Sequence, residues 1–408
     1  MAGSGAGGKL VVADTPRWDC APTSTAAVGR SNTISVLRVV YGAAPKSVTM
    51  LIRELGLSRT TVERALKELI DKGYVERAEE RGGVPQNTGR RPVMHRFRAG
   101  AGYVVGLEVG EHSVRAIVTN LEGALQADND PAGSVEHPVP QEHETAVARG
   151  ADRKTRLTAI DNTVAAVLSA AAVTPEHVWA VAAGTPGIVD QHGNVAVCNV
   201  IRGWTGDLLR THLRHLFPAQ GCDIRVENDA NLAAVAEHRM GCVGEARDVV
   251  YVLAGRRIGL GIFHGGQLHR GATGRAGEIA NIASSPWGRA NQWLRKQDRR
   301  TAAALFHATA AGEADAIARI DDLAADLAAG LAEVVHIIDP QLIVIGGGLA
   351  HAGDILVGAI RKHLDAACRV TRIPPPVELS ILGERGVVLG AVQLALEPVQ
   401  HRLSQIKL

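Results

Sequence analysis

The sequence contains few aromatic residues, few cysteines and no long apolar runs. Phe, Trp and Tyr make up 3% of its 408 residues, although 46% are hydrophobic, so we expect a core built of Ala, Val and Leu. No apolar run approaches the ~20 residues that span a bilayer, and the N-terminus does not resemble a signal peptide. The five cysteines are far apart and form no C-x-x-C pair, which argues against a disulfide framework. These absences predict a cytoplasmic protein that makes no membrane contact.

Positive charge is concentrated near the N-terminus. Residues 31–100 hold 13 Lys and Arg against 7 Asp and Glu, a net charge of +6, whereas the whole chain carries +2. Two short helices are predicted here from apolar residues at helical spacing: Val48, Leu51, Ile52 and Leu55 in the first, and Val62, Leu66, Leu69 and Ile70 in the second. Gly56 ends the first helix, and Ser58 is placed to cap the second.

Two strands, Tyr74–Arg77 and Val93–Phe97, follow the helix pair and are joined by a glycine-rich basic loop. This order of elements predicts a winged helix-turn-helix domain over residues 31–98, preceded by a disordered tail over residues 1–30. The side chains that we expect to contact DNA lie on the second helix and in the wing loop: Arg59, Thr60, Thr61, Arg64, Lys67, Arg90 and Arg91. The alternative is an ordinary solvated basic face. A single short recognition helix reads few bases, so we expect a homodimer or homotetramer on a repeated operator.

The pattern changes at the Arg98–Gly102 hinge to strands and Ala-rich helices. Residues 99–408 are predicted to form an α/β domain duplicated into two lobes, because antiparallel strands are followed by alternating strands and helices. The first predicted elements are strands Tyr103–Val109 and Val114–Thr119, a third strand after Gly123, helix Leu157–Val173 and strand Val178–Ala183. Residues 126–150 are expected to be irregular.

A set of motifs gives the chain a family resemblance. They are Gly89–Pro92, Val104–Gly110, Gly184–Val189, Val226–Asn231, Gly271–Ile279 and Val344–Gly348. In this order, over residues 31–395, they resemble the ROK family of repressors, open reading frames and kinases. The resemblance implies an actin-like sugar-kinase fold of two ribonuclease-H-like lobes around a cleft. In the repressor branch, that cleft binds a sugar or sugar phosphate and the winged helix binds an operator.

The segments that correspond to the phosphate loops of the family's kinases are altered. Asp229 stands where the family keeps its catalytic Asp, but the first loop contains Glu111 and His112, and the second contains Arg256 and Arg257. An added carboxylate repels phosphate, and two long cations fill space that the backbone needs for close approach. We therefore predict no enzyme activity and no nucleotide or other cofactor, with Asp229 a vestige of the catalytic residue.

The zinc site of the family also departs from its pattern. Asn281 replaces the family's His, and residues 284–293 contain no cysteine, so four zinc ligands cannot be assembled there. No metal site is predicted.

Amide and carboxylate side chains suit the recognition of sugar hydroxyls. The candidate effector-binding residues, carried over from the resemblance, are Asn199, Asn228, Asp229, Glu278 and Asn281. The alternative is a vestigial pocket in which Asn228 and Asp229 cap a helix starting near Leu232, and Glu278 pairs with a nearby Arg. The sequence thus predicts a transcriptional regulator that senses a sugar or sugar derivative; a repressor is favoured, although an activator would show the same sequence pattern. Two alternatives remain open: a sugar kinase with an attached DNA-binding domain, and a regulator without an effector.

Overall fold

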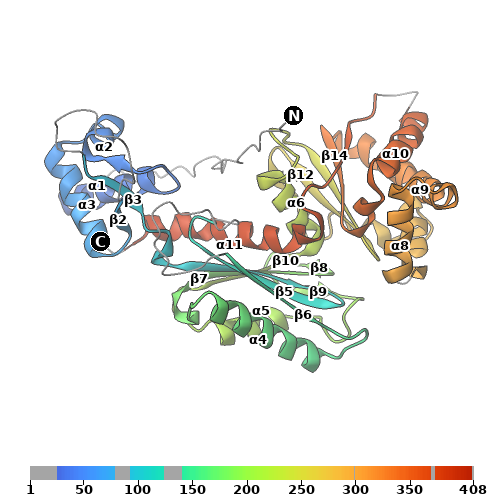
Figure 1. Ribbon diagram of the computed structural model, residues 1–408, viewed down its shortest axis with the longest axis horizontal. Coiled ribbons are helices and arrows are strands. Elements are labelled where there is room, and N and C mark those ends of the chain that lie inside the picture. The colour runs from blue at the N-terminus through green and yellow to red at the C-terminus, as the bar shows by residue number, and fades with distance from the viewer. Residues whose placement is uncertain (1–24, 79–91, 124–139, 298, 369–372, 407–408) are drawn as a thin grey trace.

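Three bodies follow one another along the chain in the computed structural model, which describes residues 25–78, 92–123, 140–297, 299–368 and 373–406. A small head and the second of two α/β lobes lie at opposite ends of the molecule, with the first lobe between them (Figure 1).

The head contains the predicted helix-turn-helix. Its elements are α1 (Thr25–Val40), β1 (Lys46–Ser47), α2 (Val48–Leu55), α3 (Arg59–Asp71), β2 (Val75–Ala78) and β3 (Met94–Phe97). The strands form an antiparallel sheet in the order β1-β3-β2. Helix α1 begins at Thr25, inside the segment of residues 1–30 that was expected to be disordered. The sequence pattern did not reveal this start, because apolar periodicity marks only the part of a helix that packs on the core. The short strand β1 was not predicted.

The first lobe has a five-stranded sheet in the order β10-β7-β4-β5-β6. Its elements are β4 (Tyr103–Val109), β5 (Ser113–Asn120), β6 (Gln141–Ala146), α4 (Arg153–Ala170), β7 (Val178–Thr185), α5 (Leu208–Leu216) and β10 (Asp223–Asn228), with a hairpin of β8 (Ile188–Val189) and β9 (Val195–Val197). Short 3-10 turns cover Ala99–Ala101 and Pro175–His177. Strand β6 corrects the expectation of irregular structure over residues 126–150. As an edge strand, β6 is polar and half exposed, so it lacks the apolar alternation of a core strand.

The second lobe repeats this arrangement with the sheet order β13-β12-β11-β14-β15. Its strands are β11 (Val249–Ala254), β12 (Ile258–His264), β13 (Gln267–Leu268), β14 (Leu342–Gly346) and β15 (Val377–Leu379). Its helices are α6 (Asp229–Met240), α7 (Pro286–Lys296), α8 (Arg299–Ala310), α9 (Ala314–Ile338) and α10 (Gly353–Cys368), with 3-10 turns at Ile279–Asn281, Gly348–Ala352 and Gly383–Arg385.

The two sheets have matching topology. In each, the first two strands pair antiparallel, the first pairs parallel with the strand that follows a helical crossover, and a further parallel strand extends that edge. The predicted duplication into two ribonuclease-H-like lobes is therefore confirmed.

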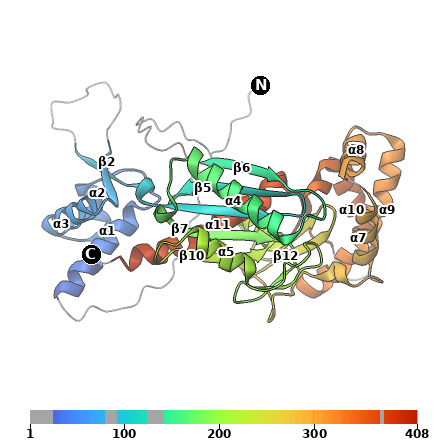
Figure 2. The same ribbon diagram turned by 90° about the horizontal axis from the view of Figure 1, so that it is seen from below.

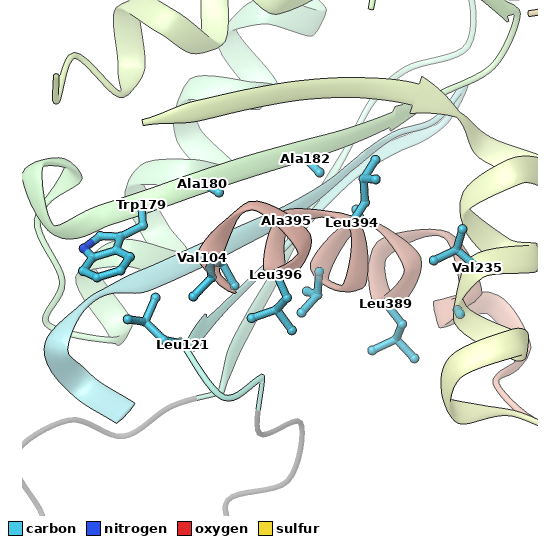
Figure 3. Packing of buried hydrophobic residues seen from close by; sticks show 14 of the residues in the cluster. Val104, Leu121, Trp179, Ala180, Ala182, Val235, Leu389, Leu394, Ala395 and Leu396 are labelled. Atoms are coloured by element: carbon cyan, nitrogen blue, oxygen red, sulfur yellow. The ribbon is translucent and has the colours of Figure 1, made fainter. Parts of the chain in front are cut away.

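The last helix, α11 (Gly386–Ser404), returns from the second lobe and covers the first sheet. In Figure 1 it lies above that sheet, and α4 and α5 lie on the other side; Figure 2 shows α4 and α5 in front of the sheet from below. Leu394, Ala395 and Leu396 of α11 are buried in a cluster that includes Val104 of β4 and Ala182 of β7 (Figure 3). One face of α11 thus closes the core of the first lobe.

Gly390 of α11 and Gly358 of α10 test this packing. A Cβ at Gly390 would lie 1.8 Å from the Leu232 carbonyl oxygen of α6, whereas a Cβ at Gly358 meets nothing within 4 Å. We expect Gly390→Ala to cost about 1–3 kcal/mol, because backbone must move to admit the methyl group. The control Gly358→Ala should stabilise by up to about 1 kcal/mol through helix propensity. Melting temperatures of the two variants measure the contrast; equal values would contradict the close contact of α11 and α6.

Candidate functional site

Helix α3 is the candidate recognition helix. It is capped by Ser58, whose hydroxyl accepts a hydrogen bond from the Thr61 N–H at 3.2 Å and lies 2.8 Å from the Thr61 hydroxyl. Both the N–H and the hydroxyl of Thr61 thus contact the Ser58 cap. Gly56 ends α2 with a φ of +65°. A residue with a side chain rarely adopts this left-handed conformation.

The outer face of α3 is polar and basic. Arg59, Thr60, Arg64 and Lys67 are all exposed, while Val62, Ala65, Leu66 and Leu69 are buried. Both ribbon views place α3 at the end of the molecule, away from the second lobe (Figures 1 and 2). This face is therefore accessible to a duplex. Arg90 and Arg91 of the wing lie outside the described residues.

Two acidic residues modify this face. Glu63 pairs with Arg59 at 2.8 Å, and both side chains are more than half exposed, so the pair is weak and can open to a phosphate. Glu68 accepts a hydrogen bond from the Thr33 hydroxyl of α1 at 3.1 Å. That bond ties α3 to α1.

The head is joined to the first lobe by polar and aromatic contacts. The Tyr41 hydroxyl donates to the Leu121 carbonyl oxygen at 2.7 Å, and burial raises the pKa of Tyr41, which keeps it a donor. Tyr74 of the head lies edge-on to Trp179 of β7 with ring centroids 6.2 Å apart. Arg402 of α11 lies 4.3 Å from the centroid of the same Trp179 ring, a cation–π distance. The head thus contacts both β7 and the end of α11.

The candidate effector site begins where β10 runs into α6. Asn228 caps α6, accepting from the Asn231 N–H at 3.1 Å, and its side-chain amide donates to the Gly187 carbonyl oxygen at 2.9 Å. Both functions of this side chain therefore serve the fold, as the capping alternative expected, although α6 begins at Asp229 and not near Leu232.

Asp229 is the central carboxylate of this site. One oxygen accepts from the Ala230 N–H at 2.9 Å. The pKa of Asp229 is raised to about 6, mainly by burial; the Ala230 N–H opposes the shift, the charge of Glu278 adds to it and Arg257 opposes it. Glu278 accepts from the Asn281 amide at 2.8 Å, so its partner is an amide and not the Arg of the alternative. Asn199 is exposed in the segment after β9. The structure brings Asp229, Glu278 and Asn281 into one neighbourhood.

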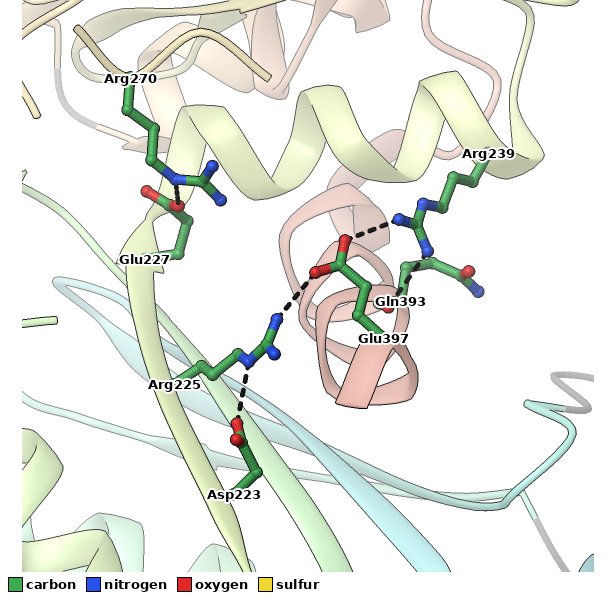
Figure 4. A network of polar contacts seen from close by, with 7 residues as sticks. All are labelled: Asp223, Arg225, Glu227, Arg239, Arg270, Gln393 and Glu397. Carbon is green, nitrogen blue, oxygen red and sulfur yellow. Dashed lines mark hydrogen bonds and ion pairs between the residues drawn. The ribbon is translucent and has the colours of Figure 1, made fainter. Parts of the chain in front are cut away.

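An ion pair between a buried carboxylate and an exposed arginine near this site was not predicted. Glu227, only 4% exposed, binds the Arg270 guanidinium at 2.5 Å and the Asn231 amide at 2.9 Å. Figure 4 shows the pair beside the start of α6. Arg270 follows β13 of the second lobe, so the pair joins the two lobes. No spacing rule links Glu227 of β10 to Arg270, which lies 43 residues further along the chain.

The two altered loops contact each other across the lobes. Arg156 of α4 binds the loop between β4 and β5. This residue is 1% exposed, and its guanidinium donates hydrogen bonds to the carbonyl oxygens of Gly110 and Glu111. His112 of this loop lies 3.2 Å from the Arg256 guanidinium of the β11–β12 loop. The space that separates two phosphate loops in a kinase is thus bridged here by side chains.

Within the described ranges, no group of three or more His, Cys, Asp or Glu side chains is placed to hold a metal ion. Among the helices that the structure describes, none is long and apolar enough to cross a bilayer.

The fold and these loops define a two-lobed sugar-kinase-like protein with a winged-helix head. A model of the ROK family matches residues 104–289 and 281–398, and a model of the MarR family matches residues 30–83. The chain belongs to the ROK family, and its head is a MarR-type winged helix-turn-helix.

Both a repressor named after a sugar and a sugar kinase are among the relatives that are similar to this chain. The xylose repressor of Caldicellulosiruptor bescii is 23% identical over 90% of this chain and 95% of its own length. The glucokinase of Streptomyces coelicolor is 26% identical over 73% of this chain and 98% of its own length.

Two solved structures share the fold. A ROK family transcriptional regulator, described as a homolog of the E. coli MLC protein, superposes with a TM-score of 0.63 at 18% identity, over 92% of this chain and 99% of its own. The ROK family glucokinase of Streptomyces griseus, in complex with glucose and AMPPNP, gives 0.56 at 22% identity, over 72% and 99%. The match to the transcriptional regulator covers enough of the chain to include the head. The match to the glucokinase covers a smaller share of the chain.

The buried carboxylates make stability depend on pH. Burial raises the pKa of Glu108 to about 7, with Arg115 opposing and Asp229 adding to the shift. A carboxyl group whose pKa is raised in the folded state binds more protons when the protein is folded than when it is unfolded. The free energy of unfolding therefore falls as the pH rises from about 4.5 to about 7. We expect Glu108→Gln to gain about 1–3 kcal/mol relative to the wild type between pH 5 and pH 8. Melting temperatures across this range measure the gain, and exposed Glu245→Gln is the control; parallel curves for Glu108→Gln and the wild type would contradict the shift.

Proposed function

We propose that this protein is a transcriptional repressor that binds operator DNA through α3 and responds to a sugar bound between its lobes. The observation that carries the proposal is the exposed basic face of α3 on a head docked against a sugar-kinase-like domain. Similarity over nearly the full length to a xylose repressor supports it. Arg64 and Lys67 are assigned to the groove-facing surface, and Arg59 and Thr60 to its rim.

The proposed binding to DNA combines base contacts from α3 with phosphate contacts. Thr61 would meet a phosphate through its hydroxyl, and Arg90 and Arg91 would reach the minor groove or backbone beside the site. One α3 spans few base pairs, so we propose that a homodimer or homotetramer places two heads on repeated half-sites.

The effector is proposed to bind at Asp229, Glu278 and Asn281, with Asn199 at the rim. Asn228 is proposed to hold the site in shape through its cap and its bond to Gly187. Carboxylate and amide groups would take directed hydrogen bonds from sugar hydroxyls.

We propose further that the protein has no kinase activity and needs no metal or cofactor of its own. The His112–Arg256 contact occupies the space between the two loops, and the Glu111 carboxylate repels a triphosphate. The competing candidate is a sugar kinase with a DNA-binding head, favoured by similarity to the glucokinase of Streptomyces coelicolor and by the presence of Asp229.

Charge reversal on α3 tests the DNA contacts. Arg64→Glu and Lys67→Glu should each lower affinity for DNA from upstream of the protein's own coding region by about 10- to 100-fold, because a cation–phosphate or cation–base contact becomes repulsive. The slope of log affinity against log salt should also fall by about 1 per lost phosphate contact. Gel shift or fluorescence anisotropy measures both.

The matched control is Lys154→Glu, an exposed reversal in the first turn of α4 on the first lobe, where a carboxylate is favoured by the helix dipole. Its affinity for DNA should match the wild type. Equal losses in Lys154→Glu and Arg64→Glu would mean that only net charge matters and would remove α3 from the proposal.

A coupled ATP-consumption assay tests the absence of kinase activity. Purified protein with glucose, xylose, N-acetylglucosamine and N-acetylmannosamine should consume no ATP above the rate without sugar, because the bridged loops exclude the triphosphate. An active glucokinase run in parallel shows that the assay reports turnover. Sustained sugar-dependent turnover, abolished in Asp229→Asn, would establish the competing candidate.

A further inference from the structure

The turn that ends the candidate recognition helix contacts the first lobe. Tyr74 follows α3 after Gly73, which has a φ of +74°, and its N–H donates to the Leu69 carbonyl oxygen in the last turn of α3 at 2.8 Å. The Tyr74 carbonyl oxygen accepts from the Arg98 N–H, just after β3, at 2.9 Å. Tyr74 is therefore tied both to the end of α3 and to the wing sheet, so a contact that holds this residue also holds α3.

Trp179 of β7 is the partner of Tyr74 in the first lobe. The two rings lie edge to face with centroids 6.2 Å apart, an arrangement in which the positive edge of one ring attracts the negative face of the other. Trp179 is 8% exposed, and the backbone of Gly102 passes so close that a Cβ there would lie 2.3 Å from the indole Nε1. The indole is thus enclosed on the Gly102 side.

Arg402 of α11 contacts the same indole. Its guanidinium carbon lies 4.3 Å from the ring centroid, and its Nη1 donates to the Gly221 carbonyl oxygen at 3.1 Å. A cavity of about 320 Å³ adjoins this contact, and its lining includes Trp179, Arg402, Asp223, Pro398 and Val399. Because the cavity leaves space beside the ring, packing alone does not hold the indole here, and the cation–π contact with Arg402 supplies a restraint.

The head has a second attachment, at the end of α1. The Tyr41 hydroxyl donates to the Leu121 carbonyl oxygen at 2.7 Å, and the Gly42 N–H donates to the Glu122 carboxylate at 3.3 Å. Leu121 and Glu122 follow β5, which lies on the other side of β4 from β7, so this attachment is about 10 Å across the sheet from Trp179. Two separate attachments fix a direction, whereas one alone would let the head turn about it.

We propose that Trp179 and Arg402 are positioning residues for operator binding. They fix the direction of α3 relative to the ROK domain, and with it the spacing of half-sites that two heads of an oligomer accept. Two recognition helices bind half-sites a helical turn or a multiple of a turn apart, and this requires that the heads be held in one orientation. The inference rests on the proposed function, since it needs the DNA contacts of α3 and two heads.

Binding of the full chain to duplexes of defined spacing tests this inference. A duplex with two half-sites is first selected from random-sequence DNA with the wild-type protein. Two derivatives are then made, one with a single half-site and one with about half a helical turn, roughly 5 base pairs, inserted between the half-sites. The wild type should bind the selected duplex about 10- to 100-fold more tightly than the insertion duplex, because the second head no longer reaches its half-site. Fluorescence anisotropy measures these affinities.

Variants of the junction separate positioning from DNA contact. Arg402→Ala and Trp179→Ala should each reduce the spacing preference to within about 3-fold, and leave affinity for the single half-site within about 2-fold of the wild type. Arg402→Lys keeps a cation over the indole and should retain most of the preference. The matched control is Arg214→Ala, which removes an exposed cation of α5 and should keep the full preference. Should Trp179→Ala not fold, the three arginine variants decide the test.

Each remaining outcome counts against a stated part. If selection enriches no duplex, the DNA binding of the proposed function is overturned. If wild-type affinity does not depend on spacing, or if Arg402→Ala and Trp179→Ala keep the wild-type preference, this inference is overturned and DNA binding stands. An equal loss at the single half-site would assign both residues to the stability of the head and would also overturn it. The same holds if Arg214→Ala loses as much as Arg402→Ala. A loss in Arg402→Lys equal to that in Arg402→Ala overturns the part assigned to the cation.

Discussion

The burial of α11 between the first sheet and α6 is the constraint on which the rest of the structure depends. The helix starts in the second lobe, crosses β4 and β7, and ends beside the head, so its position fixes all three bodies. Close approach is possible because Gly106 of β4 leaves room for the backbone at Val388, and Gly390 leaves room for α6. Glu397 adds ion pairs to Arg225 and Arg239, at 2.8 and 2.6 Å (Figure 4).

This packing places the candidate effector site and the head on one continuous series of contacts. Asp229 begins α6, α6 packs along α11, and Arg402 near the end of α11 lies on Trp179, which meets Tyr74 of the head. Packed helices move as rigid elements, so a shift of α6 relative to the first sheet must be absorbed either by α11 or by the Trp179 junction. The start of α6 is thus linked to the head through a series of packed elements.

The local sequence pattern predicted most of the helices and strands, and it failed where tertiary contacts determine the structure. The helix-turn-helix followed from apolar spacing around Leu51 and Leu66 and from the Ser58 cap, all properties of short segments. Strand β6 is polar because it lies at a sheet edge, and β1 is too short to show alternation. The acidic residues of the candidate site, Asp229 and Glu278, were predicted from motifs that resemble those of the ROK family. Arg156 of α4 and Arg270 after β13 could not be predicted, because no spacing rule joins them to their distant partners, the β4–β5 loop and Glu227.

The two loops between the lobes are held by arginine contacts, from Arg156 to the β4–β5 loop and from Arg256 to His112. A triphosphate with its metal needs backbone N–H groups and small side chains on both loops, whereas Arg156 draws the Gly110 and Glu111 carbonyl groups toward itself. Arg256 meets His112 in the space between the loops. The loops therefore differ from a nucleotide cradle, although they belong to a fold whose two lobes are intact.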